Sequence, residues 1–211
     1  MNTSTQTTSD KENQLTLGLL EAIDQNDDIS QRHLAQKMGV ALGLANSYLK
    51  RCAKKGLIKI QTAPANRYMY YLTPQGFIEK ARLTGEFLVT SLTLFRQSGD
   101  EYTKLFAECL ASSQTKVLFA GLSDLTEIAY MRSLQSEVKV VGVFQPGKVK
   151  PQFFDLDVYD SPTKFGDFDV IVMTSMEQTN ELLSVLQGDF SEHKIIIPSL
   201  LLNMNYRNEA V

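Results

Sequence analysis

The sequence predicts two folded domains in a chain of 211 residues, a small α+β domain followed by an α/β domain with a mostly parallel sheet. Apolar residues recur at helical spacing up to about residue 55, and two strand-like stretches then flank a TAPAN turn. After residue 114, short apolar runs alternate with helical runs. Alternation of this kind is typical of a parallel sheet covered by helices.

Composition excludes several classes of protein. With 43% hydrophobic and 21% charged residues, the chain can bury a core, which excludes wholesale disorder. A disulfide framework and a metal site are not expected, because the few candidate ligands lie in unrelated segments: Cys52, Cys109, His33 and His193. No apolar run reaches the roughly 18 residues of a membrane span, and the first residues lack a secretory signal. We therefore expect a cytoplasmic protein with no membrane partner.

Positive charge is concentrated in one stretch. Residues 29–78 contain no Asp or Glu, although they hold eight basic residues: Arg32, Lys37, Lys50, Arg51, Lys54, Lys55, Lys59 and Arg67. A local cationic field attracts polyanions, although a basic run can also be no more than a solvated face.

The order of predicted elements in the first half is helix, helix, helix, hairpin, helix. Residues 1–13 are predicted to be a disordered tail, and a first helix follows to about residue 24. Ser30 caps a second helix that ends at Gly39. A third helix over residues 41–55 buries Ala45, Leu49 and Cys52, which leaves a polar and basic face outward. Gly56 ends it, strands at 57–60 and 67–72 form the hairpin, and Thr73-Pro74 begins a fourth helix.

Three motifs carry a resemblance to a known family. They are LAQKMGV, LKRCAKKGLIK and YYLTPQG, and together they make residues 14–97 similar to the winged helix-turn-helix of MarR-type transcriptional regulators. The resemblance implies a third helix in the major groove of double-stranded DNA and a hairpin wing beside it. Asn46, Ser47 and Lys50 are then expected to face base edges. The expected phosphate and minor-groove contacts come from Arg51, Lys54, Lys55, Lys59 and Arg67.

We place the winged-helix domain at residues 14–74 and helices for linkage and dimerisation at 75–113. Phe77, Ala81, Leu88 and Phe95 follow a heptad-like spacing, and a second apolar stripe lies beside them. A homodimer is therefore expected, with the stretch EYTKLFAECLA packing as a second segment beside the fourth helix. The alternative is that this second stripe packs against the carboxy-terminal domain of the same chain.

Residues 114–211 resemble the Rossmann-like domains that bind sugar nucleotides or CoA, and the whole order resembles redox-sensing repressors. Strands are expected at KVLFAG, EVKVVGVF, residues 155–159, FDVIVMTS and HKIIIPS, with helices at SDLTEIAYMRSL and MEQTNELLSVLQG. The domain is expected to sense a small molecule or to mediate assembly. An anion site is a candidate where two strands end, lined by Gly121, Ser123, Asp124, Thr174 and Ser175.

Three ligand or catalytic motifs are incomplete. Only Gly121 of the dinucleotide fingerprint G-x-G-x-x-G is present, so no cofactor is expected, with NAD or another nucleotide as the less favoured alternative. Gly142 to Lys148 has the glycines and lysine of a P-loop but lacks its hydroxyl residue. Ser123 lacks the second glycine of a hydrolase elbow, and His193 alone could serve it as base. No catalytic site is predicted.

The sequence thus favours a dimeric DNA-binding transcriptional regulator that is not an enzyme. Two alternatives remain open. One is an enzyme of nucleotide or sugar-nucleotide metabolism that carries an accessory winged helix. The other is a ligand-free α/β domain used only for assembly.

Overall fold

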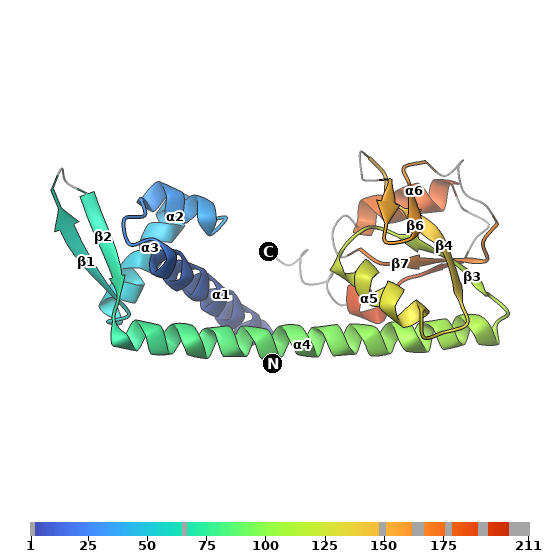
Figure 1. Ribbon diagram of the computed structural model, residues 1–211, viewed down its shortest axis with the longest axis horizontal. Coiled ribbons are helices and arrows are strands. Elements are labelled where there is room, and N and C mark those ends of the chain that lie inside the picture. Colours follow the sequence, from blue (N-terminus) through green and yellow to red (C-terminus); the bar gives the residue numbers. More distant parts are fainter. Residues whose placement is uncertain are drawn as a thin grey trace. The chain divides into compact units, whose positions relative to one another are not determined.

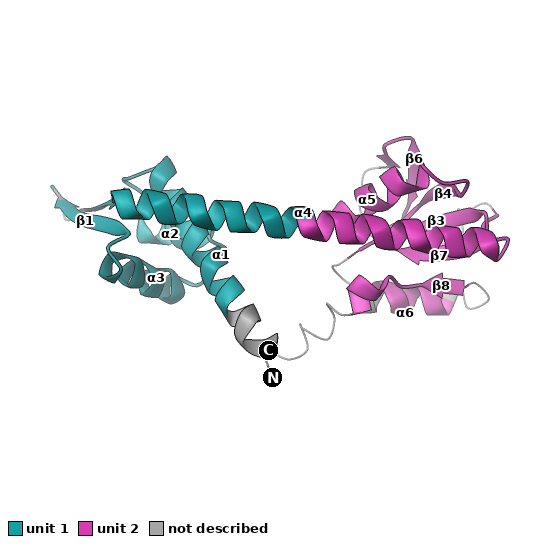
Figure 2. Cartoon of the chain, turned by 90° about the horizontal axis from the view of Figure 1, so that it is seen from below, with its two compact units in different colours: residues 1–92 teal, residues 93–211 magenta. Residues whose placement is uncertain are grey.

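The structure is a computed structural model that describes residues 3–64, 67–147, 151–161, 167–175, 179–189 and 194–202. The chain divides into two compact units, which Figure 2 shows in different colours. Unit 1 spans residues 1–92 and unit 2 spans residues 93–211. Each unit has its own hydrophobic core.

Unit 1 contains three helices, a β-hairpin and the beginning of a long fourth helix (Figure 1). The elements are α1 (Thr3–Gln25), α2 (Gln31–Lys37), α3 (Leu42–Lys54), β1 (Ile58–Ala63), β2 (Arg67–Leu72) and the first part of α4 (Pro74–Ala111). Residues from all of these except the tip of the hairpin form one core, including Leu19, Leu20, Ile23, Leu34, Leu49, Ile58, Tyr70 and Leu83. The order predicted from the sequence is confirmed.

Local signals begin α2 and end both α2 and α3 as predicted. The Ser30 hydroxyl accepts a hydrogen bond from the His33 backbone N–H at 3.2 Å and so caps α2. Gly39 has φ +64° and Gly56 has φ +71°, the left-handed conformation that ends a helix at little cost only in glycine. These two glycines turn the chain into α3 and out of it.

The amino-terminal tail differs from the prediction. The prediction of a disordered tail over residues 1–13 is wrong for residues 3–13, which belong to α1. No Gly or Pro interrupts this stretch, and Glu12 is held by an ion pair with Arg51 of α3. Tertiary contact of this kind stabilises a helix whose Ser- and Thr-rich sequence has low intrinsic propensity.

The start of α4 is fixed to the end of α3. The Thr73 hydroxyl accepts from the Gly76 N–H at 3.0 Å, which confirms the predicted cap. The Thr73 N–H donates to the Leu57 carbonyl oxygen at 3.0 Å. A Cβ at Gly76 would lie 2.0 Å from that same oxygen, so only glycine fits there.

Unit 2 is an α/β domain, as predicted. Its elements are β3 (Lys116–Ala120), α5 (Asp124–Ser133), β4 (Lys139–Phe144), β5 (Gln152–Phe153), β6 (Leu156–Tyr159), β7 (Val170–Met173), α6 (Thr179–Asp189) and β8 (Lys194–Ile196). The strand order is β5-β6-β4-β3-β7-β8, and all pairs are parallel except β5 with β6. The two-residue strand β5 was not predicted.

The order of the parallel strands reverses direction at β3. The chain steps outward from β3 to β4 and β6 on one side, and from β7 to β8 on the other. Right-handed crossovers then place α5 and α6 on opposite faces of the sheet, as Figures 1 and 2 show. In such doubly wound sheets, ligands bind at the carboxyl ends of the strands where the order reverses, here between β3 and β7.

The second half of α4 belongs to the core of unit 2. Tyr102, Phe106 and Cys109 are buried there, and the Tyr102 hydroxyl donates to the Met173 carbonyl at 3.0 Å. The expectation that EYTKLFAECLA packs as a second segment beside the fourth helix is wrong, because residues 74–111 form one continuous helix. The sequence Gly99-Asp100 does not break this helix. Gly99 is buried beside the Arg132 side chain of α5, and a Cβ at Gly99 would overlap that side chain.

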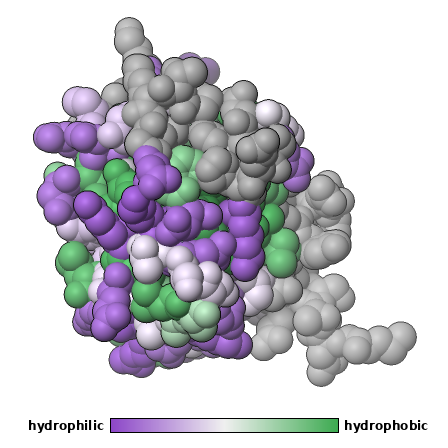
Figure 3. All heavy atoms as spheres, turned by 90° about the vertical axis from the view of Figure 1, so that its right-hand side faces the viewer, coloured by the Kyte–Doolittle hydropathy of each residue, from purple (hydrophilic) through white to green (hydrophobic). Residues whose placement is uncertain are grey.

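The surface of unit 2 is mixed in character. On the face drawn in Figure 3, hydrophobic side chains form separate areas that are bordered by hydrophilic ones. Within the described residues, no helix has the length and apolar character to cross a bilayer.

Candidate nucleic-acid interface

The outward face of α3 carries the predicted base-reading residues. Ala45, Tyr48, Leu49 and Cys52 are buried on the inner face, and burial raises the pKa of the Cys52 thiol to about 11. Ser47, Lys50 and Lys54 are exposed and lie on the opposite side of the helix. This face is polar and cationic, and its helix has dimensions that fit a DNA major groove.

Asn46 lies at the edge of this face. It is half-buried, and its Oδ1 atom is buried without a hydrogen-bond partner among the described residues. An unpaired buried acceptor costs about 1–3 kcal/mol, which is recovered when the group finds a donor. The structure therefore differs from a simple helical-wheel prediction, which places Asn46 fully outward.

The predicted phosphate contacts divide into two groups. Arg51 pairs with Glu12 through two hydrogen bonds of 2.9 and 2.8 Å, and this pair lowers the pKa of Glu12. Lys50, Lys54, Lys55 and Lys59 are exposed. In the described part of the chain, no carboxylate lies within ion-pair distance of these four ammonium groups.

The hairpin extends beyond α3 as a wing. In its antiparallel register Lys59 lies opposite Tyr71, and Arg67 lies opposite Ala63 near the tip. The backbone of Arg67 belongs to β2, while its side chain lies outside the described part. The Tyr70 N–H donates to the Asp27 carbonyl at 2.9 Å and connects the wing to the α1–α2 connection.

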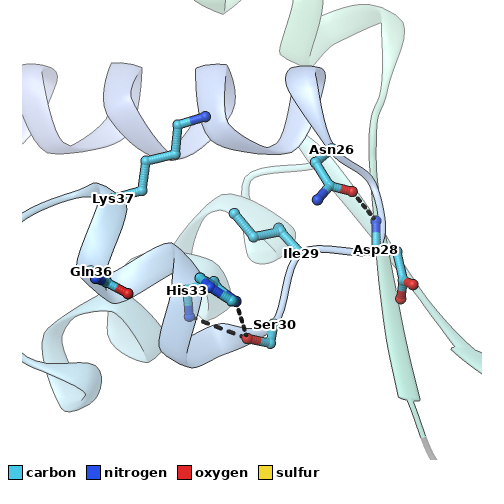
Figure 4. A pocket seen from close by; sticks show the side chains of 7 residues that line it. All are labelled: Asn26, Asp28, Ile29, Ser30, His33, Gln36 and Lys37. Atoms are coloured by element: carbon cyan, nitrogen blue, oxygen red, sulfur yellow. Dashed lines mark hydrogen bonds between the residues drawn. The ribbon is translucent and has the colours of Figure 1, made fainter.

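A polar hollow of about 500 Å³ beside α2 was not predicted from the sequence. Figure 4 shows its lining residues: Asn26, Asp28, Ile29, Ser30, His33, Gln36 and Lys37. Several of its polar groups are bonded within the chain. Asn26 accepts from the Asp28 N–H at 3.1 Å, and Lys37 donates to Gln25 of α1. Its one acid and one lysine give it no dominant charge.

The five residues of the predicted ligand site of unit 2 lie together, but their polar groups bond to one another. Gly121, Ser123 and Asp124 follow β3, and Thr174 and Ser175 follow β7, so the structure brings all five to one end of the sheet. The Ser123 hydroxyl donates to the Thr174 carbonyl at 2.6 Å, and the Thr174 hydroxyl donates to the Gly121 carbonyl at 2.6 Å. A Cβ at Gly121 would lie 2.2 Å from the Ser175 Cβ. Only Asp124 is exposed.

The backbone N–H groups that would hold a phosphate are also occupied. The Leu122 N–H donates to Gln145 Oε1 at 2.7 Å, and the Ser123 N–H donates to Thr126 Oγ1 at 2.9 Å. The Leu125 N–H donates to the Ser123 hydroxyl at 3.1 Å. A phosphate at this helix start would have to replace these bonds, which an open anion site does not require. Lys148 and His193 lie outside the described residues.

Comparison with known proteins assigns the amino-terminal unit. Residues 12–59 match the family described as winged helix-turn-helix DNA-binding. A search of curated proteins gives no match. The predicted winged helix-turn-helix is thus confirmed by the family match and by the order α1 to β2.

The solved structures that match this chain include two transcription regulators. MepR, a regulator of the Staphylococcus aureus multidrug efflux pump MepA, is 24% identical, with coverage of 49% of this chain and 78% of that chain and a TM-score of 0.36. A MarR family transcription regulator is 18% identical, covering 57% and 66% with a TM-score of 0.36. PigF with SAH is 13% identical, covering 92% and 74% with a TM-score of 0.32.

Proposed function

We propose that this chain, whose residues 12–59 match winged helix-turn-helix DNA-binding domains, is a homodimeric cytoplasmic transcription regulator of the MarR type. One observation carries the proposal. The outward face of α3 presents Ser47, Lys50 and Lys54, in a stretch of fifty residues that contains no acid. A basic helix face of this kind gives sequence-independent affinity for phosphates and side chains for base edges.

The dimer interface is proposed to lie on α4. All residues from 84 to 97 are exposed, and they include Leu88 (56% exposed), Val89 (65%), Leu92 and Phe95. Leu88, Leu92 and Phe95 are spaced by four and three residues, the spacing at which a second helix packs along a stripe. A second copy of the chain is the proposed occupant, because it would pair the two recognition helices as a palindromic site requires.

Unit 2 is proposed to mediate assembly rather than to bind a nucleotide. The support is the set of hydrogen bonds at the end of β3, where Gln145, Thr126 and Ser123 occupy the N–H groups of an anion site. A small-molecule effector would act by changing the spacing of the two recognition helices. Coupling of that kind amounts to about 1–3 kcal/mol in DNA binding.

The hydroxyl groups at the ends of β3 and β7 give little support to the enzyme alternative. The hydroxyl groups of Ser123 and Thr174 donate to backbone carbonyls, and Thr174 is fully buried. A nucleophile requires an adjacent base and access to substrate. The bonded hydroxyl groups of Ser123 and Thr174 therefore do not support the enzyme alternative.

Selection of DNA by the full chain tests the proposal. The protein is incubated with random-sequence duplexes, bound duplexes are amplified and sequenced, and affinities are then measured by fluorescence anisotropy. We expect an inverted repeat whose half-sites are separated by about one helical turn, near 34 Å, or a multiple of it. Recovery of sequences no different from the input pool would contradict the proposal.

A further inference from the structure

The first turn of α3 exposes apolar side chains that its inner face does not use. Leu42 is 45% exposed and Leu44 is 43% exposed, while Ala45 one residue later is fully buried. Single exposed leucines are common on protein surfaces. These two, however, stand at the amino-terminal end of the recognition helix, the end that contacts base edges in helix-turn-helix proteins.

Gly43 lies between the two leucines and is not required by the fold. A Cβ at this position would meet nothing within 4 Å, and no positive φ demands glycine there. Glycine within a helix is unfavourable relative to alanine. The fold of the chain therefore does not explain why residue 43 is glycine. Without a side chain there, another molecule can approach the helix backbone closely.

The surrounding charge indicates which molecule approaches. Lys50 and Lys54 lie further along the same outward face, and residues 29–78 contain no acid that would repel a polyanion. The apolar group that the major groove presents on its base edges is the C5-methyl of thymine. We infer that Leu42 and Leu44 read thymine methyl groups, so that the bound half-site contains A·T pairs opposite the start of α3. This inference rests on the proposed DNA binding.

Asn46 strengthens the assignment to A·T pairs. It lies one turn after Leu42, on the same flank of α3. A carboxamide pairs with adenine through its oxygen and its amino group together. The Asn46 Oδ1 atom is buried without a partner in the described part of the chain, so a rotation toward the groove gives this atom a donor.

Removal of the methyl group alone tests the inference. Duplexes selected by the full chain are resynthesised with deoxyuridine in place of each thymine, which changes neither base pairing nor backbone charge. We expect the wild-type chain to bind about fourfold more weakly for each contacted methyl that is lost. Leu42→Ala and Leu44→Ala should each lose this sensitivity at one position, whereas Leu134→Ala, at the C-cap of α5 in unit 2, should retain it. Equal affinity of the wild-type chain for thymine and uracil duplexes overturns the inference while leaving DNA binding intact.

Gly43→Ala gives a second readout that separates folding from binding. The added methyl has open space and improves helix propensity, so the melting temperature should rise. Affinity for the selected duplex should fall, because the methyl occupies the space between the two leucines. Unchanged or higher affinity overturns the close approach at Gly43. Failure of all variants and of the wild-type chain to bind any duplex overturns the proposed function as well.

Discussion

Glu12 and Arg51 form an ion pair with two parallel hydrogen bonds: Arg51 Nη1 donates to Glu12 Oε1 at 2.9 Å, and Nη2 donates to Oε2 at 2.8 Å. The pair joins the first helix to the recognition helix across 39 positions of sequence. Arg51 is predicted to bind phosphate, so on the proposed function Glu12 would compete with DNA for the same guanidinium. Glu12 comes from outside the acid-free stretch, and the fold brings its carboxylate to this face.

Glu12→Gln should therefore strengthen DNA binding. Freed from its carboxylate, Arg51 can pair with a phosphate, and the slope of log affinity against log salt should become steeper by about one. Anisotropy titrations at several salt concentrations measure both effects. Glu127→Gln, which alters an exposed acid on α5 of unit 2, is the matched control and should leave the slope unchanged. A weaker or unchanged affinity in Glu12→Gln would contradict the competition.

The same pair has a defined dependence on pH. The Arg51 guanidinium lowers the pKa of Glu12, so the folded-state pKa lies below the unfolded value. The contribution of the pair to stability is therefore present above the unfolded pKa and is lost as the pH falls through the folded pKa. Between pH 6 and 8, the difference in DNA affinity between wild type and Glu12→Gln should stay constant, as titrations across that range would show.

Gly76→Ala should destabilise unit 1. The new Cβ would lie 2.0 Å from the Leu57 carbonyl oxygen, a backbone atom that cannot move without displacing the end of α3. We expect a loss of about 1–3 kcal/mol in the free energy of unfolding, measured by urea denaturation. Gly85→Ala, on the same helix with nothing within 4 Å, should instead stabilise by up to about 1 kcal/mol. Equal effects of the two substitutions would contradict this role of Gly76.

Leu88→Glu should dissociate the proposed dimer. A charge in the middle of an apolar helix stripe must be desolvated on association, which is unfavourable without a partner. Sedimentation equilibrium at micromolar concentration should show a dimer for the wild type and a monomer for the variant. Leu134→Glu, at a leucine that is 68% exposed and follows α5 as its C-cap, should remain dimeric. A wild-type chain that sediments as a monomer would refute the interface.

NAD and ATP should not stabilise unit 2. A ligand at one hundred times its dissociation constant adds about 2.7 kcal/mol to folding, which a thermal shift readily detects. Because Gln145, Thr126 and Ser123 already occupy the N–H groups at the start of α5, we expect no shift with millimolar nucleotide. A clear rise in the melting temperature would restore the nucleotide-sensor alternative.

Features set by neighbouring residues were predictable from the sequence. Ser30, Gly39 and Thr73 act within a few positions along the chain, so composition and spacing identify their roles. The alternation of strands and helices after residue 114 likewise predicted a mostly parallel sheet.

Features set by tertiary contacts were not predictable. The helical state of residues 3–13 accompanies the pairing of Glu12 with Arg51, and the burial of Asn46 Oδ1 depends on how α3 packs. At the end of β3, the sequence placed Ser123 beside Thr174 but gave no sign that the two close the site by bonding each other. Such pairings join residues far apart in the sequence, so the spacing of residue types along the chain does not reveal them.

The outward face of α3 is the proposed DNA-binding surface, and a salt titration of three proteins tests whether it binds duplex DNA. Affinities of wild type, Lys50→Ala and Lys54→Ala are measured on a selected duplex and on a random duplex at increasing salt. We expect log affinity to fall linearly with log salt, and Lys50→Ala to weaken the selected duplex more than the random one. Lys54→Ala should weaken both alike and reduce the slope by about one. Affinities that neither respond to salt nor change in these variants would contradict the account.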